Sequence, residues 1–380
     1  MYTVADYGQM IADRARTDAY AEALRRTVRP DSVVLDIGTG TGMFALLACQ
    51  YGARKVYALE TDDVIHLARG LAAANGYAER IQFVQEPSTR VSLPEKADIL
   101  VSDLHGLLPL FERHIPTVID ARERLLAPGG RMIPQRDLLR AAVATLPDSC
   151  SRFRQPFATN AYGLDLSAGQ RAITNFLHRL AIKPEHLLTE PQTWAVLDFS
   201  AIQSPNVKAE LNWTMQRDGT GHGLSVWFDA ELLDGIGFSN APGIACKVYG
   251  QGFLPWSSPV ELHSGDTVSV ALQANLVGDD YVWSWNSDIH DAAGATRRQF
   301  RQSTLQGALF STAQLRRHAD HHVPQRNAEG DLDLKILELM DGNTSLEEIA
   351  RRITAQYPDR FATTQEALNH VWKLSKQYSR

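Results

Sequence analysis

The sequence is poor in cysteine and has no surplus of basic residues. Its 380 residues include three cysteines, Cys49, Cys150 and Cys246, whose wide spacing forms neither a disulfide framework nor a metal-ligand pattern. We therefore expect a reducing compartment and no bound metal. The formal net charge of −6 argues against broad nucleic-acid binding, because that binding depends on surplus lysine and arginine. The same charge suits a cationic substrate.

Long apolar runs are missing as well. No stretch is long enough to cross a bilayer, and residues 1–6 lack the features of a signal peptide. We therefore expect a cytoplasmic protein without a membrane partner. A content of 44% hydrophobic and 22% charged residues is typical of a protein with sizeable cores. The length predicts two or three domains.

The most informative feature that is present is a glycine-rich turn, DIGTGTG at residues 36–42. It follows an apolar strand at 32–35 and precedes a helix that begins near Phe44. A second short strand, at 56–59, ends on Glu60. Glycines let a ligand approach the backbone closely, and a carboxylate at the tip of the next strand can accept both hydroxyls of a ribose. The pattern predicts a nucleotide-like cofactor.

Three sequence patterns follow one another along the chain. Strands and helices alternate from about residue 30 to 142, which predicts an α/β domain with a mostly parallel sheet and the ligand at the carboxyl ends of its strands. Short alternating segments beyond Pro134 indicate an antiparallel β-barrel or sandwich, preceded by a helical arm at 162–186. From about residue 325, three amphipathic helices are expected at 332–340, 346–357 and 364–377, with Thr344 or Ser345 capping the second.

The glycine turn with Asp36 before it resembles motif I of the class I S-adenosylmethionine methyltransferases. The first 310 residues or so resemble the protein arginine methyltransferases, through the N-terminal block 10–20, the block YGARKVYALE at 51–60 and the block ARERLLAPGG at 121–130. The resemblance implies a Rossmann-like domain over 1–140 and a β-barrel domain over 141–312, with a dimerisation arm at about 155–190. It also implies a homodimer that uses S-adenosylmethionine. The cofactor residues that it implies are Met10, Arg16, Asp36, Gly38, Gly40, Thr41, Gly42, Glu60, Thr89 and Thr117, with Arg16 on the methionine carboxylate.

The family's substrate hairpin carries two glutamates that clamp a guanidinium. Here the matching positions are Asp103 and Glu112. Taken by themselves, they look like a solvated residue after a strand and an exposed helix residue; the resemblance instead makes them catalytic, because paired carboxylates suit a planar cation. His105 replaces an apolar residue and is either a base or an ordinary polar pocket residue. Trp256 belongs to the family's Thr-His-Trp loop, which reads Leu-Pro-Trp in this chain, and is expected to contact substrate.

The C-terminal segment, 325–380, resembles the small winged-helix domain of the pyrroloquinoline quinone chaperone, PqqD. That domain recognises the leader of ribosomally made, modified peptides by adding a peptide strand to a small sheet. The alternative is a helical tail that packs on the barrel or serves a dimer. The run His318-Ala319-Asp320-His321-His322 could bind a metal, but its histidines lack the i, i+4 spacing of a helical site, and a solvated linker is the other interpretation.

We therefore expect an enzyme that transfers methyl groups from S-adenosylmethionine to a peptide or protein, at an arginine of a peptide held by the C-terminal domain. One alternative is methylation of another nucleophile, such as a carboxylate oxygen, an amine or imidazole nitrogen, or a carbon. The other alternative is a non-catalytic peptide-binding protein on the same fold.

Overall fold

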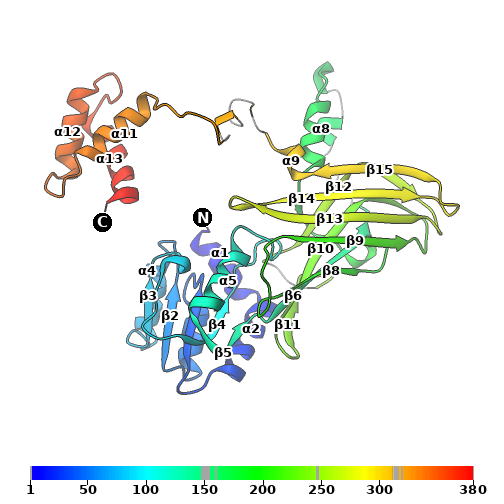
Figure 1. The fold of residues 1–380 in the computed structure, drawn as a ribbon, viewed down its shortest axis with the longest axis horizontal. Coiled ribbons are helices and arrows are strands. Elements are labelled where there is room, and N and C mark those ends of the chain that lie inside the picture. Colours follow the sequence, from blue (N-terminus) through cyan, green and yellow to red (C-terminus); the bar gives the residue numbers. More distant parts are fainter. Residues whose placement is uncertain are drawn as a thin grey trace. The chain divides into compact units, whose positions relative to one another are not determined.

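The computed structural model describes residues 2–146, 155–158, 161–244, 248–309, 311, 316–317 and 320–379. The chain divides into two compact units, Met1–Leu309 and Phe310–Arg380 (Figure 1). Cys150, Cys246 and His318 lie outside the described residues, while Cys49 is buried and free. Within the described ranges, no helix is long and apolar enough to span a bilayer.

The larger unit begins with the predicted parallel sheet, in the order β3-β2-β1-β4-β5. Its strands are β1 (Val33–Ile37), β2 (Lys55–Leu59), β3 (Ile81–Val84), β4 (Ala97–Ser102) and β5 (Leu126–Ile133). The chain proceeds outward from β1 to β3 and then returns to the other side of β1. Ile37 therefore pairs with Ser102 at the carboxyl ends of β1 and β4. Ligands bind at such a reversal point in open α/β sheets, so the turn after β1 and the hairpin after β4 share one site.

Helices cover the sheet where their apolar residues are spaced for one buried face. They are α2 (Arg14–Thr27), α3 (Met43–Gln50), α4 (Ile65–Ala74) and α5 (His114–Arg124), with a 3-10 turn, η1 (Ser88–Arg90). Tyr20 of α2 is fully buried, and its ring stacks on Phe44 of α3 with centroids 4.4 Å apart. The first helix, α1 (Val4–Ala12), contributes no residue to the core.

Antiparallel strands make up the rest of the larger unit, as the sequence pattern predicts. One sheet has the order β7-β12-β10-β6-β8 with β11 beside β10, and the other has the order β15-β14-β13-β9. We call this part the β-domain. Its strands are β6 (Arg136–Ala144), β7 (His178–Leu180), β8 (Gln192–Asp198), β9 (Val207–Thr214), β10 (Gly219–Leu233), β11 (Ile236–Ser239), β12 (Gln251–Leu262), β13 (Thr267–Val277), β14 (Asp280–His290) and β15 (Thr296–Ser303).

The predicted arm is only partly helical. It contains α7 (Gln155–Ala158), η2 (Ala161–Gly163), α8 (Ser167–Thr174) and η3 (Pro184–His186), and α8 projects beside α9 (Thr304–Gly307). Strand β7 departs from the expected helix, because Leu180 pairs with Gln251 of β12. Tyr162 is entirely exposed and Leu164 is 59% exposed, so this segment presents apolar side chains to solvent.

The smaller unit contains the three predicted helices, α11 (Ala328–Glu338), α12 (Leu346–Gln356) and α13 (Thr364–Tyr378). Ser345, rather than Thr344, caps α12 and accepts a hydrogen bond from the Glu348 backbone N–H. A separate core includes Ile336, Ile353 and Val371. The described residues of this unit include no strand, so the sheet expected of a winged-helix domain is not observed in that part of the chain.

Candidate active site

A cavity of about 800 Å³ lies at the carboxyl ends of β1, β2 and β4. This volume is within the range of small-molecule sites. Among the predicted residues, the lining includes Met10, Arg16, Gly38, Gly40, Thr41, Glu60, Thr89, Asp103, His105, Glu112 and Thr117. The fold therefore collects in one cavity most of the residues that the sequence singles out.

The glycine turn has a shape that side chains would block. Gly38 and Gly40 have φ angles of +71° and +54°, a region that glycine adopts without strain. A Cβ atom on Gly40 would lie 2.8 Å from the ring of Tyr7, and one on Gly38 would lie 2.5 Å from Leu104. The absence of both side chains lets Tyr7 and Leu104 approach the backbone of the turn closely, where both line the cavity.

Asp36 holds this turn from behind instead of lining the cavity. One of its carboxylate oxygens accepts hydrogen bonds from the Thr39 hydroxyl, at 2.5 Å, and from the Ala45 backbone N–H, at 3.1 Å. Burial raises the pKa of Asp36 to about 7. This carboxylate joins β1, the turn and α3, so we assign it a supporting role at the predicted cofactor site.

Glu60 is fixed by backbone donors at the end of β2. Its carboxylate accepts hydrogen bonds from the N–H groups of Gly40, at 2.9 Å, and of Thr61 and Asp62, at 2.8 and 3.0 Å. Each carboxylate has about four acceptor positions. One position therefore remains, and it belongs to a side chain that lines the cavity.

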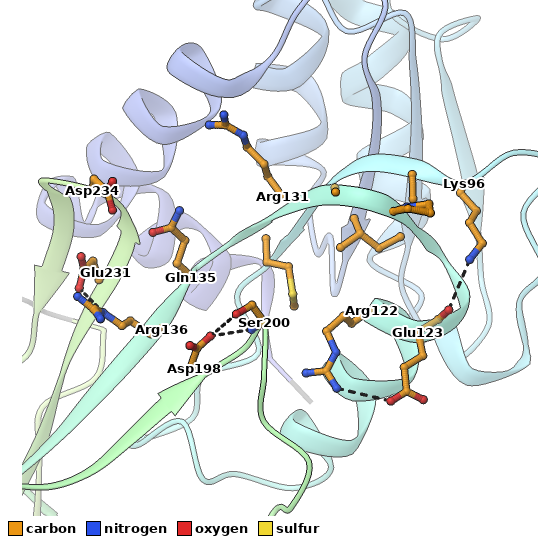
Figure 2. A pocket seen from close by; sticks show the side chains of 16 residues that line it. Lys96, Arg122, Glu123, Arg131, Gln135, Arg136, Asp198, Ser200, Glu231 and Asp234 are labelled. Atoms are coloured by element: carbon orange, nitrogen blue, oxygen red, sulfur yellow. Dashed lines mark hydrogen bonds and ion pairs between the residues drawn. The ribbon is translucent and has the colours of Figure 1, made fainter.

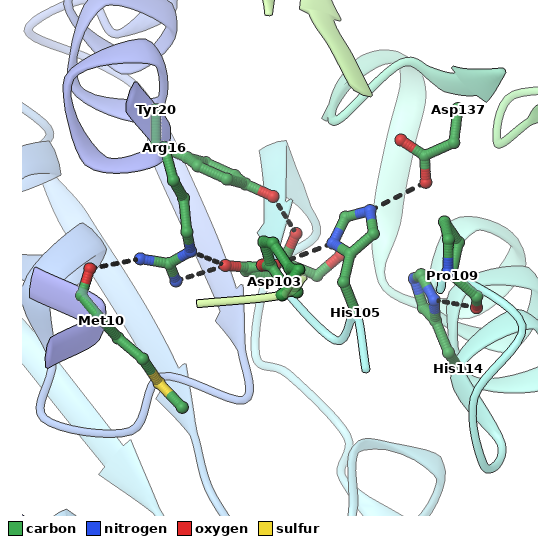
Figure 3. Close-up of polar contacts among 10 residues, drawn as sticks. Met10, Arg16, Tyr20, Asp103, His105, Pro109, His114 and Asp137 are labelled. Carbon is green, nitrogen blue, oxygen red and sulfur yellow. Dashed lines mark hydrogen bonds and ion pairs between the residues drawn. The ribbon is translucent and has the colours of Figure 1, made fainter. Parts of the chain in front are cut away.

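Arg16 points from α2 to the carboxylate of Asp103, with which it forms an ion pair and a hydrogen bond (Figure 3). Its Nη1 atom also donates to the backbone carbonyl oxygen of Met10, at 3.2 Å. A guanidinium has five N–H donors, and these contacts use three. The Tyr249 hydroxyl also interacts with this guanidinium. The permanent cation still lines the cavity, which fits the predicted role toward a ligand carboxylate.

Asp103 has no acceptor position left for a substrate. One oxygen receives Arg16, and the other accepts hydrogen bonds from His105 Nδ1 and from the Tyr249 hydroxyl, both at 2.7 Å. Burial raises the pKa of a carboxyl group, but the Arg16 charge and these hydrogen bonds outweigh burial and lower the pKa of Asp103. Asp103 is thus a permanent anion that organises Arg16, and it is not free to clamp a guanidinium.

His105 is a buried cation and not an available base. Its Nδ1 faces Asp103, and its Nε2 lies 2.8 Å from Oδ2 of Asp137, on β6 of the β-domain. Burial opposes the charged form, but the Asp137 charge and the two hydrogen bonds raise the pKa of His105 to about 10. Both ring nitrogens are engaged, so a role as proton acceptor has no support in this geometry.

Glu112 is the member of the predicted carboxylate pair that remains available. It is exposed, lines the cavity and accepts no hydrogen bond from a described residue. Its φ of 41° is rare outside glycine, and such strained positions cluster at functional sites. Of the predicted carboxylate pair, Glu112 is the one that can accept hydrogen bonds from a substrate.

Three functional candidates escape the sequence patterns. Asp137 and Tyr249 join the Asp103 network, and His114 lines the cavity from α5. His114 donates from Nδ1 to the Pro109 carbonyl oxygen at 2.8 Å, and burial together with the His105 charge lowers its pKa to about 3. Only the tertiary contacts distinguish these residues, because each is an isolated polar residue in an otherwise ordinary segment.

Gly42 and Trp256 lie away from the cavity lining. A Cβ on Gly42 would meet Ala68 at 3.1 Å, so this glycine allows the turn to approach α4 closely. Trp256 is fully buried in the β-domain, where its Nε1 donates to the Ser287 hydroxyl at 3.0 Å and its ring stacks on Phe300. Contact with substrate would require the core to open, so the structure gives the expected substrate role of Trp256 no support.

A second hollow, of about 640 Å³, lies beside β5 and the β-domain (Figure 2). Four of its charged side chains form ion pairs: Arg136 pairs with Glu231 at 2.6 Å and Arg122 with Glu123 at 3.5 Å. Asp198 accepts from the Ser200 hydroxyl at 2.6 Å. None of the described residues that line this hollow carries a buried side-chain polar atom without a hydrogen-bond partner.

The fold and the cavity define an α/β domain of the methyltransferase type joined to an antiparallel β-domain. Residues 15–133 match the family model "Ribosomal protein L11 methyltransferase (PrmA)" and residues 148–288 match "Arginine methyltransferase oligomerization subdomain". The chain is 30% identical over 270 residues to an arginine N(omega)-methyltransferase of Streptomyces achromogenes subsp. streptozoticus, which covers 69% of this chain and 74% of that protein. The chain belongs to the arginine methyltransferase family, whose members use S-adenosylmethionine.

Other relatives support the same assignment. Human protein arginine N-methyltransferase 2 is 33% identical over 288 residues, 71% of this chain and 66% of that protein. The match covers 54% of a probable protein arginine N-methyltransferase 6 of Arabidopsis thaliana. The chain therefore spans between about half and two thirds of the length of these two relatives. A Trypanosoma brucei PRMT1 enzyme–prozyme complex with AdoHcy has a TM-score of 0.71 at 25% identity over 78% of this chain and 97% of its own. Arabidopsis thaliana protein arginine methyltransferase 10 shares the fold, with a TM-score of 0.72 at 23% identity over 79% and 97% of the two chains.

Proposed function

We propose that this chain is an S-adenosylmethionine-dependent methyltransferase that modifies the guanidinium of an arginine in a peptide or protein. One observation carries the proposal: the glycine turn, Glu60, Arg16 and the exposed carboxylate of Glu112 line the same cavity. The first three fit the cofactor, and Glu112 fits a cation placed beside it. The identity of the relatives as arginine methyltransferases supports the same reaction.

The cofactor would supply a methyl group made electrophilic by its bond to a sulfonium sulfur. The backbone of the turn at Gly38 and Gly40 would lie along one side of the cofactor. The acceptor position left on Glu60 would bind one ribose hydroxyl, and the Arg16 guanidinium would bind the methionine carboxylate. A guanidinium nitrogen is a poor nucleophile because its lone pair is delocalised. Glu112 would accept two N–H groups of the guanidinium and aim the remaining nitrogen at the methyl group, so positioning supplies most of the rate. The proton that this nitrogen loses on methylation would pass to the Glu112 carboxylate.

Substitution of Glu112 tests this role. Glu112→Gln keeps the shape but removes the charge, and we expect turnover to fall by about a hundredfold or more, with S-adenosylhomocysteine binding nearly unchanged. The measurement is transfer of a labelled methyl group to an arginine peptide, with calorimetric binding in parallel. Glu123→Gln, an exposed position on α5, is the matched control. Normal turnover of Glu112→Gln would eliminate the proposed role.

The substrate itself needs a separate experiment. We would incubate the enzyme and labelled cofactor with free arginine, with an arginine peptide and with peptides in which lysine, histidine or glutamate replaces the arginine. Fragmentation then locates the added mass. Label on the arginine peptide supports the proposal. Label on another side chain favours the alternative nucleophiles, and binding without transfer to any of them favours a non-catalytic peptide-binding protein.

We further propose that the smaller unit binds a ribosomally made peptide while its arginine is modified. Its apolar side chains include Trp372, which is 58% exposed, and Tyr378, which is 59% exposed. We would compare arginine peptides with and without an N-terminal extension. Trp372→Ala should raise KM for the extended peptide alone. An equal KM for both peptides in the native chain would count against leader recognition.

A homodimer is the assembly that we propose for this chain. The match of residues 148–288 to an oligomerization subdomain supports it, as do the exposed Tyr162 and Leu164 of the arm. Sedimentation at several concentrations should give twice the chain mass. A monomer at every concentration would refute the dimer.

A further inference from the structure

A buried row of alternating charges connects the β-domain to the predicted cofactor site. It runs from Asp137 on β6, through His105 and Asp103 on the hairpin after β4, to Arg16 on α2 (Figure 3). The side chains of Asp137 and His105 are fully buried, and those of Asp103 and Arg16 are 5% and 10% exposed. Two carboxylates therefore alternate with two cations, and the row is close to neutral.

Each link of this row restricts the next one. The His105 ring stacks on Phe228 of β10, with centroids 4.9 Å apart and planes 7° apart, and the Asp137 carboxylate holds its Nε2. This leaves Nδ1 directed at one oxygen of Asp103. The other oxygen of Asp103 then receives Arg16, whose remaining N–H donors line the cavity.

We infer that Asp137 and His105 are positioning residues, which act through Asp103 to hold the Arg16 guanidinium where it binds the carboxylate of the cofactor. The inference rests on the proposed cofactor site but is independent of which substrate is methylated. It assigns a cofactor-related task to a residue of the β-domain, the part of the chain otherwise associated with substrate and oligomerisation.

The alternative is that the pair only stabilises the packing of the hairpin on β6. Removing one partner is the weaker test, because it also leaves an uncompensated charge in the core. Removing both avoids this effect, since a buried ion pair can be replaced by apolar side chains without a large loss of stability. The double variant His105→Leu with Asp137→Leu is therefore the main test, and Asp137→Asn is the second variant.

The experiment compares two ligands that share the adenosine part. S-adenosylhomocysteine carries the amino-acid carboxylate, whereas 5′-methylthioadenosine lacks it. Binding of each to the full chain is measured by calorimetry. If the row positions Arg16, the double variant loses about tenfold in affinity for S-adenosylhomocysteine, while its affinity for 5′-methylthioadenosine changes by less than about twofold. Asp137→Asn should shift the affinity ratio in the same direction.

The outcomes separate the inference from the proposed function. Affinities for both ligands that fall equally, or a ratio that stays at its native value, would overturn the positioning role. A native chain that binds neither ligand would instead overturn the proposed cofactor site. Asp229→Asn is the matched control. Asp229 lies on β10 and pairs at 2.9 Å with Arg140 of β6, the strand that also carries Asp137, but it does not line the cavity. The affinity ratio of this variant should equal the native one.

Discussion

The protonation of His105 predicts an unusual pH dependence of stability. Its pKa lies at about 10 in the folded chain, against 6.5 for a solvated histidine. Above pH 6.5 the unfolded chain has lost this proton while the folded chain keeps it. His105 should therefore make its full contribution to the free energy of unfolding below the unfolded pKa. This contribution should fall as pH rises toward the folded pKa, by about 1.4 kcal/mol per pH unit.

The useful window lies between about pH 7 and about pH 8.5, where the predicted loss is about 2 kcal/mol. Burial raises the pKa of Asp36 to about 7, so its own stability loss is complete near the lower limit. The pKa of Cys49 is raised from 9.0 to about 11, also by burial, so its loss begins above the upper limit. His105 is fully buried, so solvent does not screen its charge from Asp103 and Asp137.

Urea unfolding followed by tryptophan fluorescence provides the assay. Six of the seven tryptophans belong to the larger unit, and Trp372→Phe removes the one in the smaller unit. In that background, the free energy of unfolding is measured across the window for the native pair and for the double Leu variant at 105 and 137. The native pair should show the full slope and the double variant a slope near zero. Equal slopes in the two proteins would refute the charged state of His105.

Two further perturbations have expected outcomes. Gly40→Ala should weaken S-adenosylhomocysteine binding, measured by calorimetry, by about tenfold, because the new methyl group would meet the Tyr7 ring at 2.8 Å. Gly129→Ala is the control: φ is also positive there but the space is open, so binding should stay intact. Trp256→Phe should lower the free energy of unfolding by about 1–3 kcal/mol, through the lost hydrogen bond to Ser287, and leave KM for peptide unchanged; a raised KM would restore Trp256 as a substrate contact.

Local sequence patterns are sufficient to predict most helices and strands and much of the cavity lining. The glycine turn after β1 and the acid after β2 each follow a buried apolar strand, so their positions at one sheet edge follow from the parallel topology. The helices of the smaller unit are predicted by the helical spacing of their apolar residues, and the second of them also by a capping residue at Thr344 or Ser345. The structure of the arm is harder to predict, because β7 has only three residues. It forms by pairing with β12, a segment far away in the chain.

The roles within the site could not be obtained in that way. Most of the site residues predicted from the sequence reach the cavity, because strand ends and turns are local. His114 and Tyr249 also line it and were not predicted, and Trp256 is buried in the β-domain. Their charges and partners depend on contacts across the fold: Asp103 is occupied by Arg16, His105 and Tyr249, and Glu112 is left available. Asp137 enters the network from another sheet. Burial and the field of neighbouring charges set the protonation of such groups, and both depend on distances across the fold that spacing along the chain does not specify.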